Sequence, residues 1–122
     1  MPKFTIEFYE DASGGKPVEE FLLSLDVRMR AKLLGILQVL QEKGNQLREP
    51  YSKHLEDGIF EVRGKVGTDI TRVLYFFYCD GKIIVTNGFV KKTQKTPANE
   101  IRTAKKRRNE YMERRRQDEN IR

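Results

Sequence analysis

Apolar and polar residues alternate at the start of the chain and then change to a helical spacing. In KFTIEFY, residues 3–9, every second side chain is large and apolar, which is the pattern of an amphipathic strand. Between residues 18 and 43 the apolar positions recur every three or four residues, as they do on one face of a helix. Asp26 interrupts this stretch with a side chain suited to an N-cap, and Gly44 suits a helix end. The pattern therefore predicts one strand followed by two helices.

The second half of the chain predicts a sheet. Three apolar stretches, residues 58–64, 69–79 and 82–90, are separated by short turns. Asp80-Gly81, between the last two, favours a two-residue type I′ hairpin. The polar segment NQLREPYSKHLED, residues 45–57, predicts a connector that leads into the sheet.

Thr96-Pro97 predicts the start of a final helix that ends near Arg115, followed by a frayed tail at about 117–122. This helix has a narrow apolar stripe, which consists of Ile101, Ala104 and Tyr111 with the stem of Arg108. The predicted order is β-α-α-β-β-β-α, an α+β fold in which the helical pair covers one face of an antiparallel sheet. With a length of 122 residues, we expect residues 1–122 to form a single domain.

Positive charge is concentrated in the last quarter of the chain. Residues 1–90 contain 12 Lys/Arg and 13 Asp/Glu, whereas residues 91–122 contain 12 Lys/Arg and 5 Asp/Glu. Lys91, Lys92 and Lys95 follow the last predicted strand within five residues. A basic end on a near-neutral body favours a nucleic acid or an acidic protein as a partner, and a solvated basic helix is the alternative.

The apolar stretches also bear on the compartment. No stretch of 18 apolar residues occurs and the N-terminus has no apolar signal region, so we expect a cytoplasmic protein without a membrane contact. Cys79 is the single cysteine, which excludes an internal disulfide and fits a reducing compartment. Its apolar surroundings in the sequence predict a small buried side chain.

The sequence lacks the usual motifs of metal and cofactor enzymes. With one histidine and one cysteine it has no zinc ligand set, and it has neither a glycine-rich phosphate loop before a helix nor a cluster of carboxylates. An enzyme with this sequence would therefore use bases and cations alone, with no cofactor and no metal.

Candidate cations are spread over the predicted strands. Phe60 and Val62 are expected to face the helices, so Glu61 and Arg63 project from the opposite face. Arg72 lies in a strand that is apolar on both faces, so its side is not assigned by periodicity. Each of these has a plain structural alternative: Arg63 as an exposed strand arginine, or Glu61 and Arg63 as a simple ion pair.

Two further pairs of basic residues flank the sheet. Lys53 and His54 precede its first strand, and Lys91 and Lys92 follow its last one. Antiparallel pairing can bring the end of the third strand near the start of the first, so we expect these groups to converge. The alternatives are a surface histidine at position 54 and edge-protecting lysines at positions 91 and 92.

The chain resembles the RelE/ParE superfamily of small bacterial toxins, specifically its phage-derived HigB-like branch. The resemblance rests on LEDGIFEVR (55–63), RVLY (72–75), the DG hairpin (80–81), GFVKKTQKTP (88–97) and EIRTA (100–104). It implies a RelE-like fold and a ribosome-dependent mRNA endonuclease that cuts the codon in the A site without metal. It also implies a HigA-like helix-turn-helix antitoxin, through which alone the protein would reach operator DNA.

The resemblance also implies roles for individual residues. Arg63 matches a phosphate-stabilising arginine, and Lys53 or His54 stands where a general base is expected. Arg72 is either catalytic or a sheet-supporting ion pair. The pair Lys91 and Lys92 matches the region that supplies a cation to the transition state. Contacts with ribosomal RNA are expected from Lys95, Lys105, Lys106, Arg107 and Arg108.

The sequence departs from the family in one respect. Several RelE-type toxins have a tyrosine after the last strand that stacks on the RNA base, and KKTQKTP has none. Phe89 or a strand tyrosine is the expected substitute. Three other functions remain open: a ParE-like toxin that inhibits DNA gyrase, a non-catalytic nucleic-acid-binding module, and an α+β domain whose basic helix only docks an acidic antitoxin.

Overall fold

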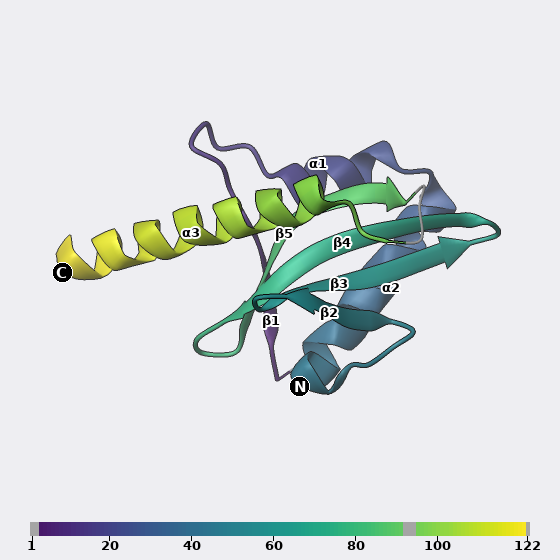
Figure 1. The fold of residues 1–122 in the computed structure, drawn as a ribbon, viewed down its shortest axis with the longest axis horizontal. Helices are drawn as coiled ribbons and strands as arrows, with labels where there is room; N and C mark the ends of the chain where they lie inside the picture. Colours follow the sequence, from purple (N-terminus) through teal and green to yellow (C-terminus); the bar gives the residue numbers. More distant parts are fainter. Residues whose placement is uncertain (1–2, 92–94, 122) are drawn as a thin grey trace.

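The computed structural model describes residues 3–91 and 95–121 of the chain, which form a five-stranded sheet between two layers of helix (Figure 1). The elements in order are β1 (Thr5–Phe8), α1 (Pro17–Ser24), α2 (Val27–Lys43), a 3-10 turn (Gly44–Gln46), β2 (Ser52–Glu56), β3 (Ile59–Val66), β4 (Asp69–Tyr78), β5 (Lys82–Lys91) and α3 (Ala98–Ile121). The α+β class and both helix boundaries at Asp26 and Gly44 are confirmed, since Asp26 caps α2 through Met29 N and Gly44 ends it.

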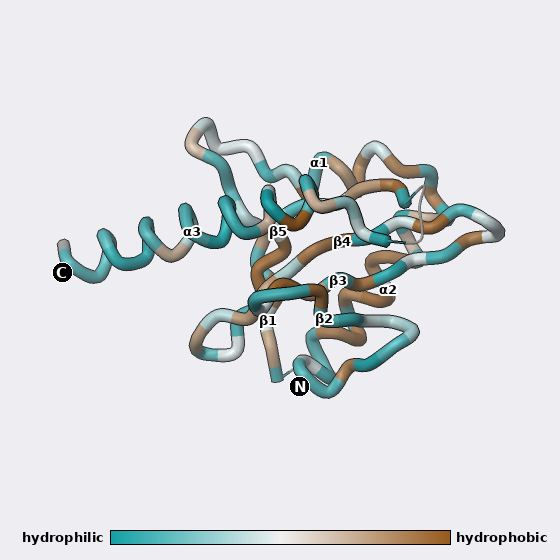
Figure 2. The backbone as a smooth tube through the Cα atoms, viewed as in Figure 1, coloured by the Kyte–Doolittle hydropathy of each residue, from teal (hydrophilic) through white to brown (hydrophobic). Residues whose placement is uncertain are grey.

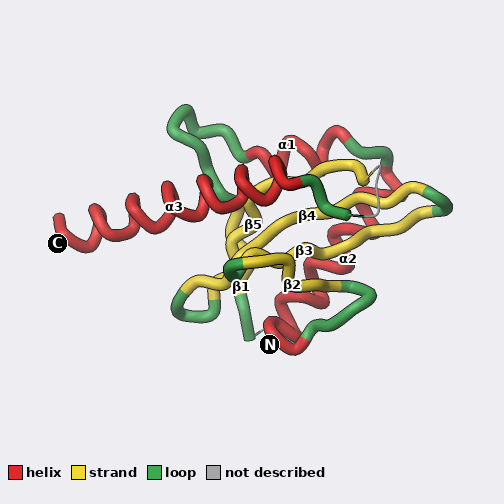
Figure 3. The backbone as a smooth tube through the Cα atoms, in the orientation of Figure 1, coloured by secondary structure: helices red, strands yellow, loops and turns green. Residues whose placement is uncertain are grey.

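One strand was missed by the sequence pattern. The last part of the predicted connector forms β2, which pairs antiparallel with β3 in the register Ser52 with Val62. The turn between them is Asp57-Gly58, and both residues have positive φ, 50° and 77°. Asp80-Gly81 has the same geometry, with φ of 65° and 70°, which confirms the hairpin expected there. The observed order is therefore β-α-α-β-β-β-β-α (Figure 3).

The strands lie in the order β1-β5-β4-β3-β2. The predicted antiparallel pairing is correct for β2 to β5, but β1 pairs parallel with β5, with Thr5 beside Lys82. After β1 the chain forms α1, α2, β2, β3 and β4 before β5 comes to lie beside β1. Because that pairing joins residues far apart in sequence, it is not visible in local patterns.

The helical pair covers one face of the sheet, as expected. Val18, Leu33 and Leu40 are fully buried there against Val62 and Val73. Gly88 lets α1 approach β5 closely, because a Cβ at this position would lie 2.4 Å from Cδ2 of Phe21.

The opposite face is partly covered by α3. Ala104 and Tyr111 are buried against Leu74, Phe76 and Ile84, so the predicted apolar stripe of this helix is confirmed. The predicted end at Arg115 is too early, because α3 continues to Ile121 through residues expected to fray. Figure 1 shows its second half running out past the sheet, and Figure 2 shows that this half consists mostly of hydrophilic residues.

The burial predicted for Cys79 is wrong. Cys79 is exposed, not buried as its neighbours suggested, because β4 ends at Tyr78 and Cys79 enters the hairpin turn.

Among the helices of residues 3–91 and 95–121, none is both long and apolar enough to cross a membrane.

Candidate functional site

The face of the sheet that carries α3 bears a group of cations that includes Arg63, Arg72, Lys91 and Lys53. Arg63 on β3 lies directly opposite Arg72 on β4, so their side chains share a face. Lys91 on β5 is opposite Ile70, two residues from Arg72, and Lys53 on β2 is opposite Glu61. The neighbouring Val62 belongs to the core under α1 and α2, so Glu61 and Arg63 lie on the opposite face, as the alternation predicts.

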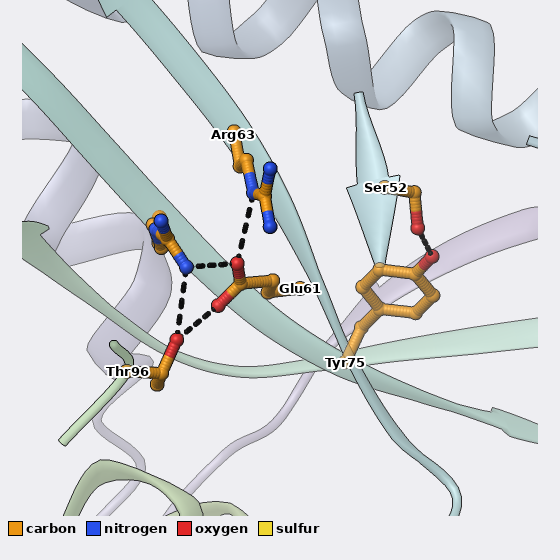
Figure 4. A network of polar contacts seen from close by, with 6 residues as sticks. Ser52, Glu61, Arg63, Tyr75 and Thr96 are labelled. Carbon is orange, nitrogen blue, oxygen red and sulfur yellow. Dashed lines mark hydrogen bonds and ion pairs between the residues drawn. The ribbon is translucent and has the colours of Figure 1, made fainter. Parts of the chain in front are cut away.

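Glu61 is the centre of this cluster. Its side chain is fully buried and accepts hydrogen bonds from Arg63 Nε at 3.0 Å, from Arg72 Nη1 and from Thr96 Oγ1 (Figure 4). Thr96 Oγ1 in turn accepts a hydrogen bond from Arg72 Nη1 at 3.0 Å. Thr96, which the sequence placed at the start of the final helix, thus joins the chain before α3 to the sheet.

The carboxyl group of Glu61 remains ionised at neutral pH. Burial alone raises its pKa, but hydrogen bonds from Arg72, Thr96 and Arg63 lower the pKa by more, so the net shift is downward. One carboxylate between two guanidinium groups leaves an excess positive charge.

Arg72 and Arg63 have different surroundings. Arg72 is buried, and within residues 3–91 and 95–121 its Nε has no hydrogen-bond partner. Arg63 has a side chain that is 24% exposed and contacts Glu61 through Nε. The partly exposed side chain of Arg63 is therefore positioned for an external anion, while Arg72 holds Glu61 in place.

The pKa of Lys91 reflects the positive charge of the cluster. Its pKa is lowered from the usual 10.5, first because the ammonium group loses water and then because Arg72, Arg63 and Lys53 are positive; Glu61 partly offsets this. These four cations are therefore close enough to interact.

A cavity of about 560 Å³ opens beside the cluster. Arg63, Arg72 and Lys91 line it together with Lys32 and Lys65, and its described lining contains no Asp or Glu. Such a concentration of cations attracts phosphate groups. A larger cavity of about 770 Å³ between β1 and α3 lacks this excess, because Glu7, Glu10, Glu19 and Asp118 accompany its three basic residues.

Two other predicted catalytic residues lie elsewhere. His54 projects from the opposite face of β2, where its ring meets Phe60 at 4.9 Å between centroids and its Nε2 accepts from Gly58 N at 3.2 Å. It therefore does not join the cluster with Lys53. Lys92 lies outside the residues that the structure describes.

The basic residues of α3 mostly contact the protein itself. Lys105 Nζ lies 2.5 Å from Glu56 Oε2, Arg108 Nη2 lies 3.0 Å from Asp57 Oδ2, and Arg107 Nη1 donates to Thr86 O at 2.8 Å. These contacts dock α3 on β5 and on the turn between β2 and β3. Lys95 and Lys106 are exposed.

Sequence reasoning missed Thr96 as a partner of Glu61, and it missed the cavity residues Lys32, Tyr51 and Lys65. Lys65 has the same strand parity as Arg63, which is a signal that the alternation contained. Lys32 and Tyr51 come from other elements, so only the three-dimensional arrangement reveals them.

The comparisons with known proteins give a family. The model of the Gp49-like phage-derived proteins (DUF891) matches residues 20–109, a range that includes Lys53, Arg63, Arg72 and Lys91. The chain belongs to the Gp49-like family. This family consists of RelE-like, toxin-like proteins. No curated protein matches the chain.

Proposed function

We propose that this Gp49-like protein is the toxin of a HigBA-type toxin–antitoxin system and acts as a ribosome-dependent mRNA endoribonuclease. The observation that carries the proposal is the cavity lined by five cations and no described carboxylate, in which Glu61 holds Arg63 in position. Membership in a toxin-like family supports the biological role.

The reaction that suits this cavity is cleavage of RNA by its own 2′-hydroxyl. A base removes the proton of the hydroxyl group, the 2′-oxygen attacks the adjacent phosphorus, and the bond to the 5′-oxygen breaks. The leaving 5′-oxygen takes up a proton, so the products are a 2′,3′-cyclic phosphate and a 5′-hydroxyl. Fixed cations stabilise the additional negative charge of the transition state.

The surroundings of each residue indicate which step of the reaction it performs. Arg63 binds the phosphate, because its side chain is partly exposed and is held by Glu61. Lys91 lines the cavity and has a lowered pKa, so its amine is suited to exchange a proton with the RNA. Lys53, exposed on the same face, is the second candidate for the base. Arg72 acts as a positioning residue, because it is buried against Glu61.

The proposed partners follow from the same assignment. The substrate is mRNA in the ribosomal A site in the cytoplasm, and the exposed Lys95 and Lys106 are placed to meet ribosomal RNA. A HigA-like helix-turn-helix antitoxin neutralises the toxin and links it to operator DNA.

The test is expression in growing bacteria without a partner protein, followed by mapping of mRNA ends. We expect translation to stop and messages to be cut within reading frames, and Arg63→Ala to lose at least about a hundredfold in cleavage. Arg28→Ala, which removes an exposed arginine of α2, is the control. Intact messages with gyrase-linked DNA breaks would instead establish a gyrase inhibitor, and harmless expression would leave a nucleic-acid-binding module.

A further inference from the structure

A second hollow adjoins the cationic cavity. It has a volume of about 490 Å³ and lies between α2 and the segment before β2, where its apolar walls include Val39 and Leu47. Ile36, Lys32 and Tyr51 line both the hollow and the cavity, so the two spaces meet at these side chains. Both volumes lie in the range of about 300–1,000 Å³ that is typical of small-ligand sites.

Tyr51 stands at the boundary between a charged and an apolar space. The residue is 53% exposed, although Tyr is large and apolar over most of its surface. Its carbonyl oxygen accepts a hydrogen bond from Arg63 N at 3.0 Å, which fixes the Tyr51 backbone beside the phosphate-binding arginine. Tyr51 is therefore placed by the sheet and not by a loose loop.

The charges around the two hollows select the occupant. Lys32 and Lys43 are the charged residues that line the apolar hollow, and no described acidic residue lines either space. An occupant must therefore combine negative charge with a flat apolar part. A nucleotide has both, because its phosphate is anionic and its base stacks on aromatic rings.

Resting on the proposed function, we infer that the two hollows form one nucleotide site: Arg63 and Lys91 hold a phosphate of single-stranded RNA, and the adjoining base stacks on Tyr51 and enters the apolar hollow. Tyr51 is thus the residue that contacts the base, in place of a tyrosine after the last strand. Neither Phe89 nor Tyr75 is suited to this contact, because Phe89 packs against the core under α3 and Tyr75 is buried with its hydroxyl 2.5 Å from Ser52 Oγ.

Five variants separate the two parts of the site. Tyr51→Ala removes the ring, and Tyr51→Phe keeps it. Gly35→Leu fills the apolar hollow without altering a cation, since a Cβ at Gly35 meets no described atom within 4 Å. Gly35→Ala is its matched control, because it adds a single methyl group to the same exposed helix position. Arg63→Ala removes the phosphate contact.

The measurement is the affinity of the full chain for two short 2′-O-methylated RNAs, which resist cleavage. One carries all of its bases, and the other has a single abasic position. We expect the wild type to bind the complete RNA about tenfold more tightly. Tyr51→Ala and Gly35→Leu should abolish this difference and leave binding of the abasic RNA unchanged, while Tyr51→Phe and Gly35→Ala retain the difference. Arg63→Ala should weaken binding of both RNAs and reduce its salt dependence.

Several results would overturn the inference. It fails if the wild type binds the two RNAs equally, or if Tyr51→Ala weakens both to the same extent. It also fails if Gly35→Leu leaves the difference intact, in which case the hollow receives something other than a base, such as a segment of a protein partner. These outcomes are independent of the nuclease: cleavage of mRNA by the wild type without base discrimination refutes the base site alone, and base discrimination without cleavage refutes the nuclease alone.

Discussion

Arg63 and Arg72 lie directly opposite each other on β3 and β4, and the buried carboxylate of Glu61 accepts a hydrogen bond from both. Two like charges at facing positions of a sheet repel each other. Glu61 offsets this repulsion and fixes both guanidinium groups. The same carboxylate binds Thr96, so one buried side chain holds together β3, β4 and the segment before α3.

Glu61→Gln should therefore destabilise the fold by about 3–5 kcal/mol, because it leaves the buried Arg72 without its counter-charge. Urea unfolding followed by circular dichroism measures this loss. Glu42→Gln makes the same chemical change at an exposed site of α2 and should have almost no effect. Equal stabilities of the two variants would contradict the central role of Glu61.

Thr96→Val tests the third hydrogen bond to the same carboxylate. The change keeps the shape of the side chain but removes the hydroxyl between Glu61 and Arg72, so we expect a loss of about 1–3 kcal/mol. Thr96→Ser retains the hydroxyl and should retain most of the stability. A serine variant as unstable as the valine variant would show that the methyl group matters and the hydrogen bonds do not.

Stability should depend on pH through Glu61. Its pKa is lower in the folded chain than in the unfolded chain, because three hydrogen bonds favour the charged form. Folding is therefore stabilised above the unfolded pKa, about 4.5, and this contribution disappears as the pH falls through the lower folded value. The free energy of unfolding of wild type and Glu61→Gln, measured from pH 7 to pH 2, should converge in acid. Parallel curves would exclude this linkage.

The faces of the strands were predictable only where one face is polar. In β3, Phe60 and Val62 alternate with Glu61 and Arg63, and the structure places them on opposite faces as expected. In β4 both faces are apolar, because α1 and α2 cover one and α3 covers the other, so parity alone did not place Arg72. Its position follows from its register with Arg63.

The edges of the sheet and the walls of the cavity were harder to predict for other reasons. β2 is an edge strand with mostly exposed side chains, so it has no apolar alternation, although Asp57-Gly58 repeats the turn signal of Asp80-Gly81. The cavity is lined by α2, by β3 to β5 and by the segment before β2. No local pattern connects Lys32 or Tyr51 with Arg63, because tertiary packing brings them together.

Lys91 provides a direct test of the field in the cavity. Arg63 lowers the pKa of Lys91 by repulsion of its ammonium charge, so Arg63→Ala should raise that pKa toward the usual 10.5. Arg28→Ala removes the same charge from an exposed site on α2 and should leave the titration of Lys91 unchanged.

The measurement is an NMR titration of the Lys91 side chain in the three proteins. If Lys91 exchanges a proton during cleavage, a change in the pKa of Lys91 should move the alkaline limb of the pH–rate profile in the same direction. The variant that changes this pKa must keep Arg63, because Arg63 binds the phosphate. Lys53→Ala alters the field and leaves Arg63 in place, because Lys53 also repels Lys91. Since Lys53 is itself the second candidate for the base, loss of cleavage in this variant would assign the base to Lys53. A Lys91 pKa that rises in Lys53→Ala while the rate profile stays fixed would assign the proton transfer to another group.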